Sequence, residues 1–225
     1  MPYLKRPQSG ESLISLMIGL LISVVVALAM LSMFKVASRN GGQAGQDAAA
    51  DAQLTSALLR AGIAAQDAGF GIATPTLGTQ LKVIASATLT GATLSGTAAS
   101  STGAGNVVIW AMKTGSVNQC AGLYFKDASD GTGGLYYLGP VACSTGDLSS
   151  WNTMSWTSAR WADRPANQST DAYNQTAISF TLDSASCKPF GLDGSSIGAV
   201  MLTISGKSRS DQDLAEKQCL FNFKT

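Results

Sequence analysis

The sequence predicts an α+β protein in which a long N-terminal α-helix, apolar in its first half and amphipathic in its second, packs on an antiparallel β-sheet. Three observations lead to this fold class. An uncharged apolar run covers residues 12–34, and an amphipathic helical pattern covers residues 43–68. Short strand-like runs separated by Gly, Asp, Asn and Pro clusters cover most of the remaining chain. With 225 residues, the chain is long enough for one such helix and one domain of ordinary size.

The apolar run at residues 12–34 follows Lys5 and Arg6 and precedes Lys35 and Arg39. At a rise of about 1.5 Å per residue, some twenty residues cross a hydrocarbon core of roughly 30 Å. The run is too long for the apolar core of a cleaved secretory signal peptide. We therefore predict a transmembrane helix. Lys5 and Arg6 favour a cytoplasmic N-terminus, although Lys35 and Arg39 weaken that contrast.

The second half of the predicted helix has one apolar face. Its apolar residues recur at spacings of three and four and are Ala50, Leu54, Ala57, Leu58, Ala61, Ala65 and Ala68. A domain is therefore expected to pack on this face. Gly41 and Gly42, at about 1 kcal/mol each relative to alanine, predict a loosened or interrupted helix before it. This glycine pair is either a simple break or a flexible point. Gly69 and Gly71 fit the helix end.

The rest of the chain reads as a β-rich domain. Charged residues make up only 13% of the sequence, and Ser, Thr, Gly and Ala are abundant, which suits an extracytoplasmic surface. The predicted strands are 88–90, 93–95, 107–112, 122–126, 135–138, 177–182, 199–205 and 220–223, with a mobile loop at 96–105. These strands are expected to form one antiparallel sheet across the second half of the helix.

Four cysteines, Cys120, Cys143, Cys187 and Cys219, all lie beyond the apolar run. An even number of cysteines on the exported side of a membrane favours two disulfides. Of the three pairings, we prefer Cys120–Cys143 with Cys187–Cys219 because each closes a local loop. Neither gap has the short spacing of a zinc site, and the chain has no histidine. We therefore expect no metal site.

The residues before the apolar run form a short basic leader that ends at Gly10 and is followed by Glu11. This order resembles the class III signal of type IV pilins and type II secretion pseudopilins. The resemblance implies that a prepilin peptidase cuts after Gly10 on the cytoplasmic side and methylates Glu11, so that the apolar helix stays on the mature chain. The long helix with an amphipathic second half also resembles minor pilins of the PilW type and, more loosely, the J-type pseudopilins. The fold class implied is that of the pilins.

Two positions depart from the family pattern. The first mature residue, commonly phenylalanine, is Glu11, and the fifth, commonly glutamate, is Ser15. In the family this glutamate neutralises the N-terminal ammonium of a neighbouring subunit inside the apolar filament core, where a lone charge is expensive. Because Ser15 supplies no carboxylate, the resemblance implies a minor subunit near the tip. Gly19 and Ser23 offer small or polar contact points for helix packing in a membrane or filament.

An enzyme is not expected. Without histidine, Ser-His-Asp and Cys-His arrangements are excluded, and the only glutamates are Glu11 and Glu216. We also expect no cofactor.

Three tryptophans and two arginines are candidate interface residues, in a loop-like stretch between two predicted strands: Trp151, Trp156, Arg160, Trp161 and Arg164. One interpretation is a recognition surface for a neighbouring subunit or an extracellular ligand. For DNA, the arginines would contact phosphates and the tryptophans would stack on bases. The interpretation we favour is that these rings cover the core of a thin β-domain.

The sequence thus predicts four segments: a leader peptide at 1–10, a transmembrane or filament-core helix at 11–36, its amphipathic continuation at 37–71, and an extracytoplasmic β-rich domain at 72–225. The resemblance implies a minor pilin that initiates assembly of a type IV pilus or lies near its tip, and that supports adhesion, motility or DNA uptake. Three alternatives stay open, namely a type II secretion pseudopilin, a major pilin and a static membrane-anchored adhesin.

The same resemblance implies partners and a location. The partners are the prepilin peptidase, the inner-membrane assembly platform, other pilin subunits and, before assembly, membrane lipid. The chain is expected in the inner membrane with its C-terminal domain in the periplasm, and afterwards in a cell-surface pilus or pseudopilus.

Overall fold

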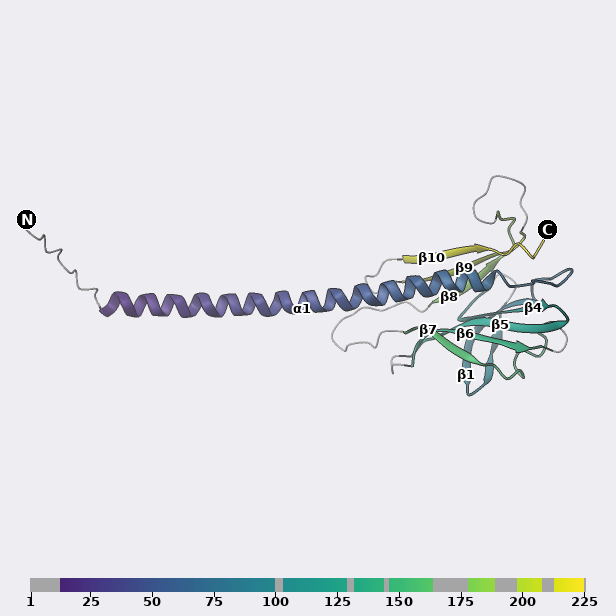
Figure 1. Cartoon of the computed structure of the whole chain (residues 1–225), viewed down its shortest axis with the longest axis horizontal. Helices are drawn as coiled ribbons and strands as arrows, with labels where there is room; N and C mark the ends of the chain where they lie inside the picture. Colours follow the sequence, from purple (N-terminus) through teal and green to yellow (C-terminus); the bar gives the residue numbers. More distant parts are fainter. Residues whose placement is uncertain are drawn as a thin grey trace, which may run out of the picture. The chain divides into compact units, whose positions relative to one another are not determined.

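The computed structural model describes residues 13–99, 103–128, 132–143, 146–163, 178–188, 198–207 and 213–224. The chain divides into two compact units, Met1–Gln46 and Asp47–Thr225. The predicted α+β class is confirmed, because the described part contains one long helix, α1 (Leu13–Ala65), and antiparallel strands that pack on its second half (Figure 1).

The helix α1 continues through Gly41 and Gly42, so the predicted interruption is wrong. Each glycine costs only about 1 kcal/mol, and propagating an established helix adds one hydrogen bond for each residue fixed. Beyond the helix's own backbone, no atom of the part of the chain that the structure describes lies within 4 Å of a Cβ built at either glycine, so packing among these residues does not require glycine there. The helix ends at Ala65, close to the predicted end, and Gly69 and Gly71 have φ angles of 75° and 70° in the turns that follow.

The strands form two antiparallel sheets rather than the predicted one. The six-stranded sheet has the order β2 (Thr93–Ala98), β1 (Leu81–Thr90), β4 (Val107–Thr114), β5 (Val117–Lys126), β6 (Gly134–Ala142) and β7 (Ser158–Asp163). The four-stranded sheet has the order β10 (Asp213–Cys219), β9 (Met201–Lys207), β8 (Ser179–Asp183) and β3 (Ala104–Gly105). One helix cannot cover both faces of the larger sheet, whose strand β4 is buried from Val107 to Met112.

The C-terminal end of the sequence was also assigned incorrectly. The predicted strand at 220–223 is a turn region, and the last strand is instead Asp213–Cys219. In this strand the inward positions include Glu216 and Gln218, which lie against Gly62 of α1. Leu214 is the apolar member of the inward positions, and because Glu216 and Gln218 are polar the strand shows no apolar alternation in the sequence.

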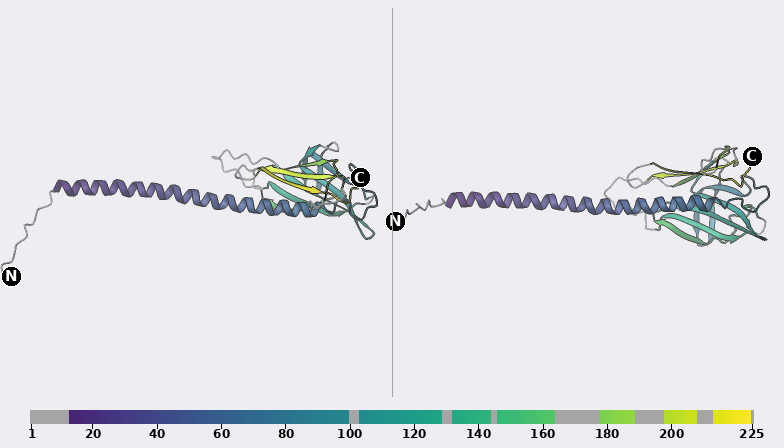
Figure 2. Two further views of the ribbon diagram at one scale, coloured as in Figure 1. Left: turned by 90° about the horizontal axis from the view of Figure 1, so that it is seen from above. Right: turned by 45° about the horizontal axis from the view of Figure 1, so that its top comes forward.

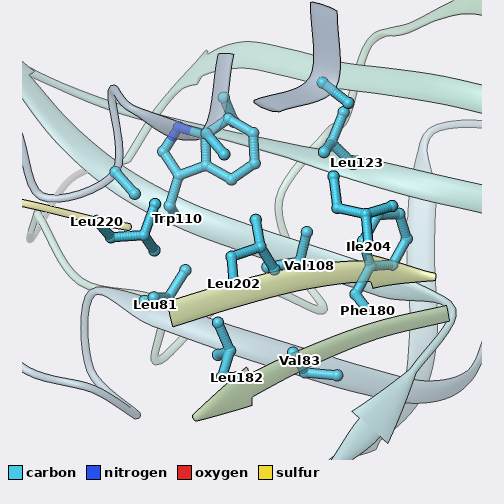
Figure 3. Packing of buried hydrophobic residues seen from close by; sticks show 14 of the residues in the cluster. Leu81, Val83, Val108, Trp110, Leu123, Phe180, Leu182, Leu202, Ile204 and Leu220 are labelled. Atoms are coloured by element: carbon cyan, nitrogen blue, oxygen red, sulfur yellow. The ribbon is translucent and has the colours of Figure 1, made fainter. Parts of the chain in front are cut away.

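The main core lies between the two sheets and the last turns of α1, where β10 approaches the helix from one side and β7 from the other (Figure 2). Leu182 and Leu202 from the four-stranded sheet lie next to Leu81 and Val108 from the six-stranded sheet (Figure 3). The helix contributes Ala57, Leu58, Ala61 and Ala65, which confirms the predicted apolar face. Small alanine side chains let the helix backbone approach the strands closely.

A second core covers the opposite face of the six-stranded sheet. Ile84, Leu94 and Ile109 point into it, and Cys143 with the segment 146–157 covers it, including Leu148 and two tryptophans. The disulfide Cys120–Cys143 connects β5 to the start of this segment. The other disulfide is Cys187–Cys219, and both bring their Cα atoms to 5.7 Å. The predicted pairing is therefore confirmed.

Candidate functional site

From Leu13 to Phe34, α1 presents an apolar surface on every side. The large apolar side chains between Leu13 and Val36 are all exposed, and none of this segment is buried within the chain. The helix is long and apolar enough to cross a membrane, by length and composition. A surface of this extent is stable only when lipid or other protein covers it.

Two serine hydroxyls of this segment are satisfied within the helix. The Ser23 hydroxyl donates a hydrogen bond of 2.8 Å to the Leu20 carbonyl, and the Ser32 hydroxyl donates one of 2.8 Å to the Ala29 carbonyl. An apolar environment therefore leaves neither hydroxyl without a partner.

The predicted contact residues of the helix lie on one ridge. Ser15, Gly19 and Ser23 are spaced by four residues, and Ala27 continues the series. Apart from the neighbouring backbone of the helix itself, no atom of the described residues lies within 4 Å of a Cβ built at Gly19. Another helix can therefore approach this ridge closely. The predicted processing residues Gly10 and Glu11 lie outside the described residues.

In the second unit, Trp161 forms a three-layer stack that joins α1 to β7. Its ring is parallel to that of Tyr137, with centroids 4.8 Å apart and an interplanar angle of 5°. The Cζ atom of Arg60 lies 4.4 Å from the Trp161 ring centroid. Because a guanidinium does not fit between rings this close, Arg60 covers the opposite face. Neither face of Trp161 is therefore open to a nucleotide base.

The stack continues towards the main core. Trp110 lies 6.5 Å from Tyr137 between ring centroids and is buried. Burial, together with the nearby Asp67 carboxylate, raises the pKa of Tyr137 above its ordinary value. The phenol therefore stays neutral at physiological pH, and the stack carries its positive charge at Arg60.

Trp151 and Trp156 are not surface anchors. They are 9% and 2% exposed, and the Trp156 indole donates a hydrogen bond of 2.9 Å to the Trp151 carbonyl. Both belong to the second core, whereas Trp161 packs against the main core on the other face of the sheet. The structure thus agrees with the favoured interpretation that these rings cover a core, and the predicted cluster does not form one surface.

Of the two candidate arginines, the described residues include Arg160 alone. Arg160 is exposed on β7 and forms an ion pair with Asp163 at 3.0 Å, while Arg164 lies outside the described residues. β7 was not predicted because four of its six residues are exposed and its burial does not alternate along the strand.

The exposed apolar residues of α1 in the second unit were also missed. Leu59 and Ile63 are 56% and 73% exposed and lie four residues apart on the helix, so they share a face turned away from both sheets. Phe70, beyond the helix end, is 53% exposed. The signal was present in the sequence, because Leu59 and Ile63 are the large apolar residues of this segment that fall outside its predicted apolar face.

Comparison of the chain with protein-family models, curated proteins and solved structures gave no significant match. Within the described ranges, no group of three or more His, Cys, Asp or Glu side chains is placed to hold a metal ion.

Arg60 and Trp161 are expected to be energetically coupled. In a double-mutant cycle of Arg60→Ala and Trp161→Ala, we expect a coupling free energy of about 1 kcal/mol, because the guanidinium lies over an aromatic face. Urea denaturation of the full chain in detergent measures it. Arg160→Ala is the matched control and is expected to cost less than about 1 kcal/mol, because exposed ion pairs contribute little. A coupling near zero would mean that Arg60 does not hold the helix to β7.

Proposed function

We propose that this chain is a minor subunit of a type IV pilus or of the related type II secretion pseudopilus. The observation that carries the proposal is the division of α1. Its first part is apolar on every side and is not buried by any of the described residues, while its second part is built into a disulfide-linked β-domain. Such a helix can exchange lipid neighbours for the helices of other subunits without unfolding the domain.

The features of the helix support close packing with like helices. The ridge of Ser15, Gly19 and Ser23 lets a second helix approach, and the Ser23 hydroxyl is already bonded within its own helix. The missing carboxylate at Ser15 supports a minor subunit rather than the main subunit of a long fibre. The exposed pair Leu59 and Ile63 gives the second unit an apolar surface suited to contact with a neighbouring subunit.

The proposal includes the partners and the route. The chain would insert with its N-terminus in the cytoplasm, be cut after Gly10 by a prepilin peptidase, and be methylated on Glu11. The assembly platform of the inner membrane would then transfer the helix from lipid into a filament, with the β-domain outside the cytoplasm. The disulfides support an oxidising compartment for this domain. DNA remains a weaker partner, because Trp161 is covered on both faces.

Mass spectrometry of the mature N-terminus tests the proposal. We expect the chain isolated from membranes to begin at methylated Glu11, and we expect Gly10→Val to retain the leader because the family's peptidase requires the glycine. Gly19→Ala is the matched control, because a Cβ at Gly19 meets no atom of the described residues beyond the helix's own backbone, and it is expected to be processed normally. An intact leader on the wild-type chain would exclude the processed classes and leave a static membrane anchor.

A second measurement separates the two filament systems. In cells that carry only the Gly10→Val chain, loss of surface pili with normal secretion supports the pilus. Loss of secretion with normal pili supports the pseudopilus. Both phenotypes intact, with a processed wild-type chain, would contradict a required role in either assembly.

A further inference from the structure

The two sheets end in four edge strands, and only one of the longer ones is without charge. β7 carries Arg160 and Asp163 and contacts α1 through Trp161. β10 carries Asp213, Glu216 and Lys217, and it also lies against α1. β3 has only two residues. β2, with the sequence TLSGTA, has neither a charged residue nor a proline.

Charges, prolines and short lengths are the usual means by which edge strands avoid pairing with other chains. Over its six residues β2 has none of these three protections, and its pairing with β1 has one register shift, opposite Gly96. Its residues Thr93 and Ser95 to Ala98 are exposed, while Leu94 is buried and fixes the strand on the second core. An uncharged edge is thus presented to the surroundings.

The register shows which backbone groups of β2 point outwards. Thr93 and Ser95 pair with Thr90 and Thr88 of β1, and the Ala99 amide donates a hydrogen bond of 2.8 Å to the Val83 carbonyl. In an antiparallel pair, hydrogen-bonded and non-hydrogen-bonded residues alternate. The register shifts between Ala85 and Thr88 of β1, opposite Gly96, so the alternation is read separately on each side of this shift. Read from Thr93 and Ser95 on one side and from Ala99 on the other, the backbone groups that point away from β1 are those of Leu94 and Ala98. Within the described residues, neither of these amides donates a backbone hydrogen bond to a loop.

We propose that β2 pairs antiparallel with β2 of a second copy of this chain, so that the two six-stranded sheets join across a twofold axis at Gly96. The pairing opposes Leu94 to Ala98 of the other copy and Gly96 to itself, which satisfies the outward groups of both strands. An isologous contact requires a surface that is complementary to itself. β2 meets this requirement because pairing it with itself opposes no like charges, whereas self-pairing of β7 or β10 would bring charged residues together.

The side chains of β2 also suit this pairing. Around the twofold axis, Ser95 lies opposite Thr97 of the other copy as a non-hydrogen-bonded pair, where side chains are closest. Hydroxyl pairs of this kind already form within the chain, since the Thr88 and Ser95 hydroxyl oxygens lie 2.8 Å apart. A short contact of this kind is expected to be weak, on the order of micromolar in dissociation constant.

Cysteine cross-linking tests the register. Full chains carrying either Ser95→Cys or Thr97→Cys are mixed in detergent, with more micelles than chains, and oxidised mildly. We expect a disulfide-linked dimer from the mixture and little from either variant alone, because residue 95 faces residue 97 and not itself. Equal cross-linking of all three samples, or none, would overturn the proposed pairing. Association through the apolar helix alone gives no such register.

Sedimentation of the full chain in detergent provides the second measurement. Ser95→Lys combined with Thr97→Lys places lysines opposite each other across the axis, and Ala98→Pro removes an outward amide. Each is expected to weaken the dimer at least about tenfold. Thr88→Lys combined with Thr90→Lys puts the same charges one strand further in, and it is expected to leave the dimer constant within about threefold. A dimer insensitive to both the lysine pair in β2 and Ala98→Pro would place the contact elsewhere.

Discussion

Replacing Phe180 by alanine is expected to lower the free energy of unfolding by about 3–5 kcal/mol, since large core side chains carry costs of this size. Phe180 is fully buried in β8, where it pairs with Ile204 of β9. Both side chains lie in the core between the sheets (Figure 3). The cavity left by the ring lies between two sheets. Because other contacts hold these sheets in place, they cannot move together to fill it. Urea denaturation of the full chain in detergent, followed by tryptophan fluorescence, measures the loss.

Ile63→Ala is the matched control for this prediction. It also removes a large apolar side chain, but Ile63 is 73% exposed on α1. We expect a change in unfolding free energy within about 0.5 kcal/mol, as for most surface substitutions. If Ile63→Ala were as costly as Phe180→Ala in the isolated chain, the assignment of the core would be wrong. A defect of Ile63→Ala confined to filament assembly would instead support its role as a subunit contact.

The helix and the disulfides could be predicted because their signals are local. The spacing of Ala57, Leu58, Ala61 and Ala65 repeats with the period of a helix, so the buried face can be read from a short window. The apolar run before it, residues 12–34, contains no charged residue and is long enough to cross a membrane. The disulfides follow the shortest loops, with sequence separations of 23 and 32 residues.

The second sheet could not be predicted because its signals are not local. β3 and β8 pair across more than seventy residues, and β10 turns Glu216 and Gln218 towards the helix instead of apolar residues. The sequence likewise gives no indication that Arg60 and Trp161 meet, since they lie about a hundred residues apart in the chain. At Gly41 and Gly42 the local signal was present but too weak, because about 1 kcal/mol for each glycine does not stop an established helix.

Removing both disulfides is expected to lower the free energy of unfolding of the β-domain more than any other change considered. From the length of the closed loops, each disulfide contributes about 3.5 kcal/mol by restricting the unfolded chain. We therefore expect Cys187→Ala with Cys219→Ala, and separately Cys120→Ala with Cys143→Ala, each to lower the free energy of unfolding by about that amount. The measurement is urea denaturation in detergent. A loss below about 1 kcal/mol would mean that the unfolded chain is not restricted by the bond.

A substitution at Gly198 separates two contributions of the disulfide Cys187–Cys219, namely closure of a loop in the unfolded chain and packing in the folded one. A Cβ at Gly198 would lie 2.7 Å from the sulfur of Cys219 and 2.9 Å from that of Cys187, so Gly198→Ala is expected to destabilise the oxidised chain. In the chain with both of these cysteines replaced by alanine, the same substitution is expected to cost less, because the sulfur atoms that it meets are gone. Equal costs in the two backgrounds would assign the requirement for glycine to the backbone alone.

The two disulfides lie in different parts of the domain, so their losses are expected to add. Cys120 and Cys143 belong to the second core, whereas Cys219 ends the edge strand of the four-stranded sheet. Loss of both would remove about 7 kcal/mol from a domain whose total stability is expected at about 5–15 kcal/mol. The chain made in a reducing cytoplasm should therefore be largely unfolded or degraded, and the exported chain folded. Equal protease resistance of the two would show that the domain does not need an oxidising compartment.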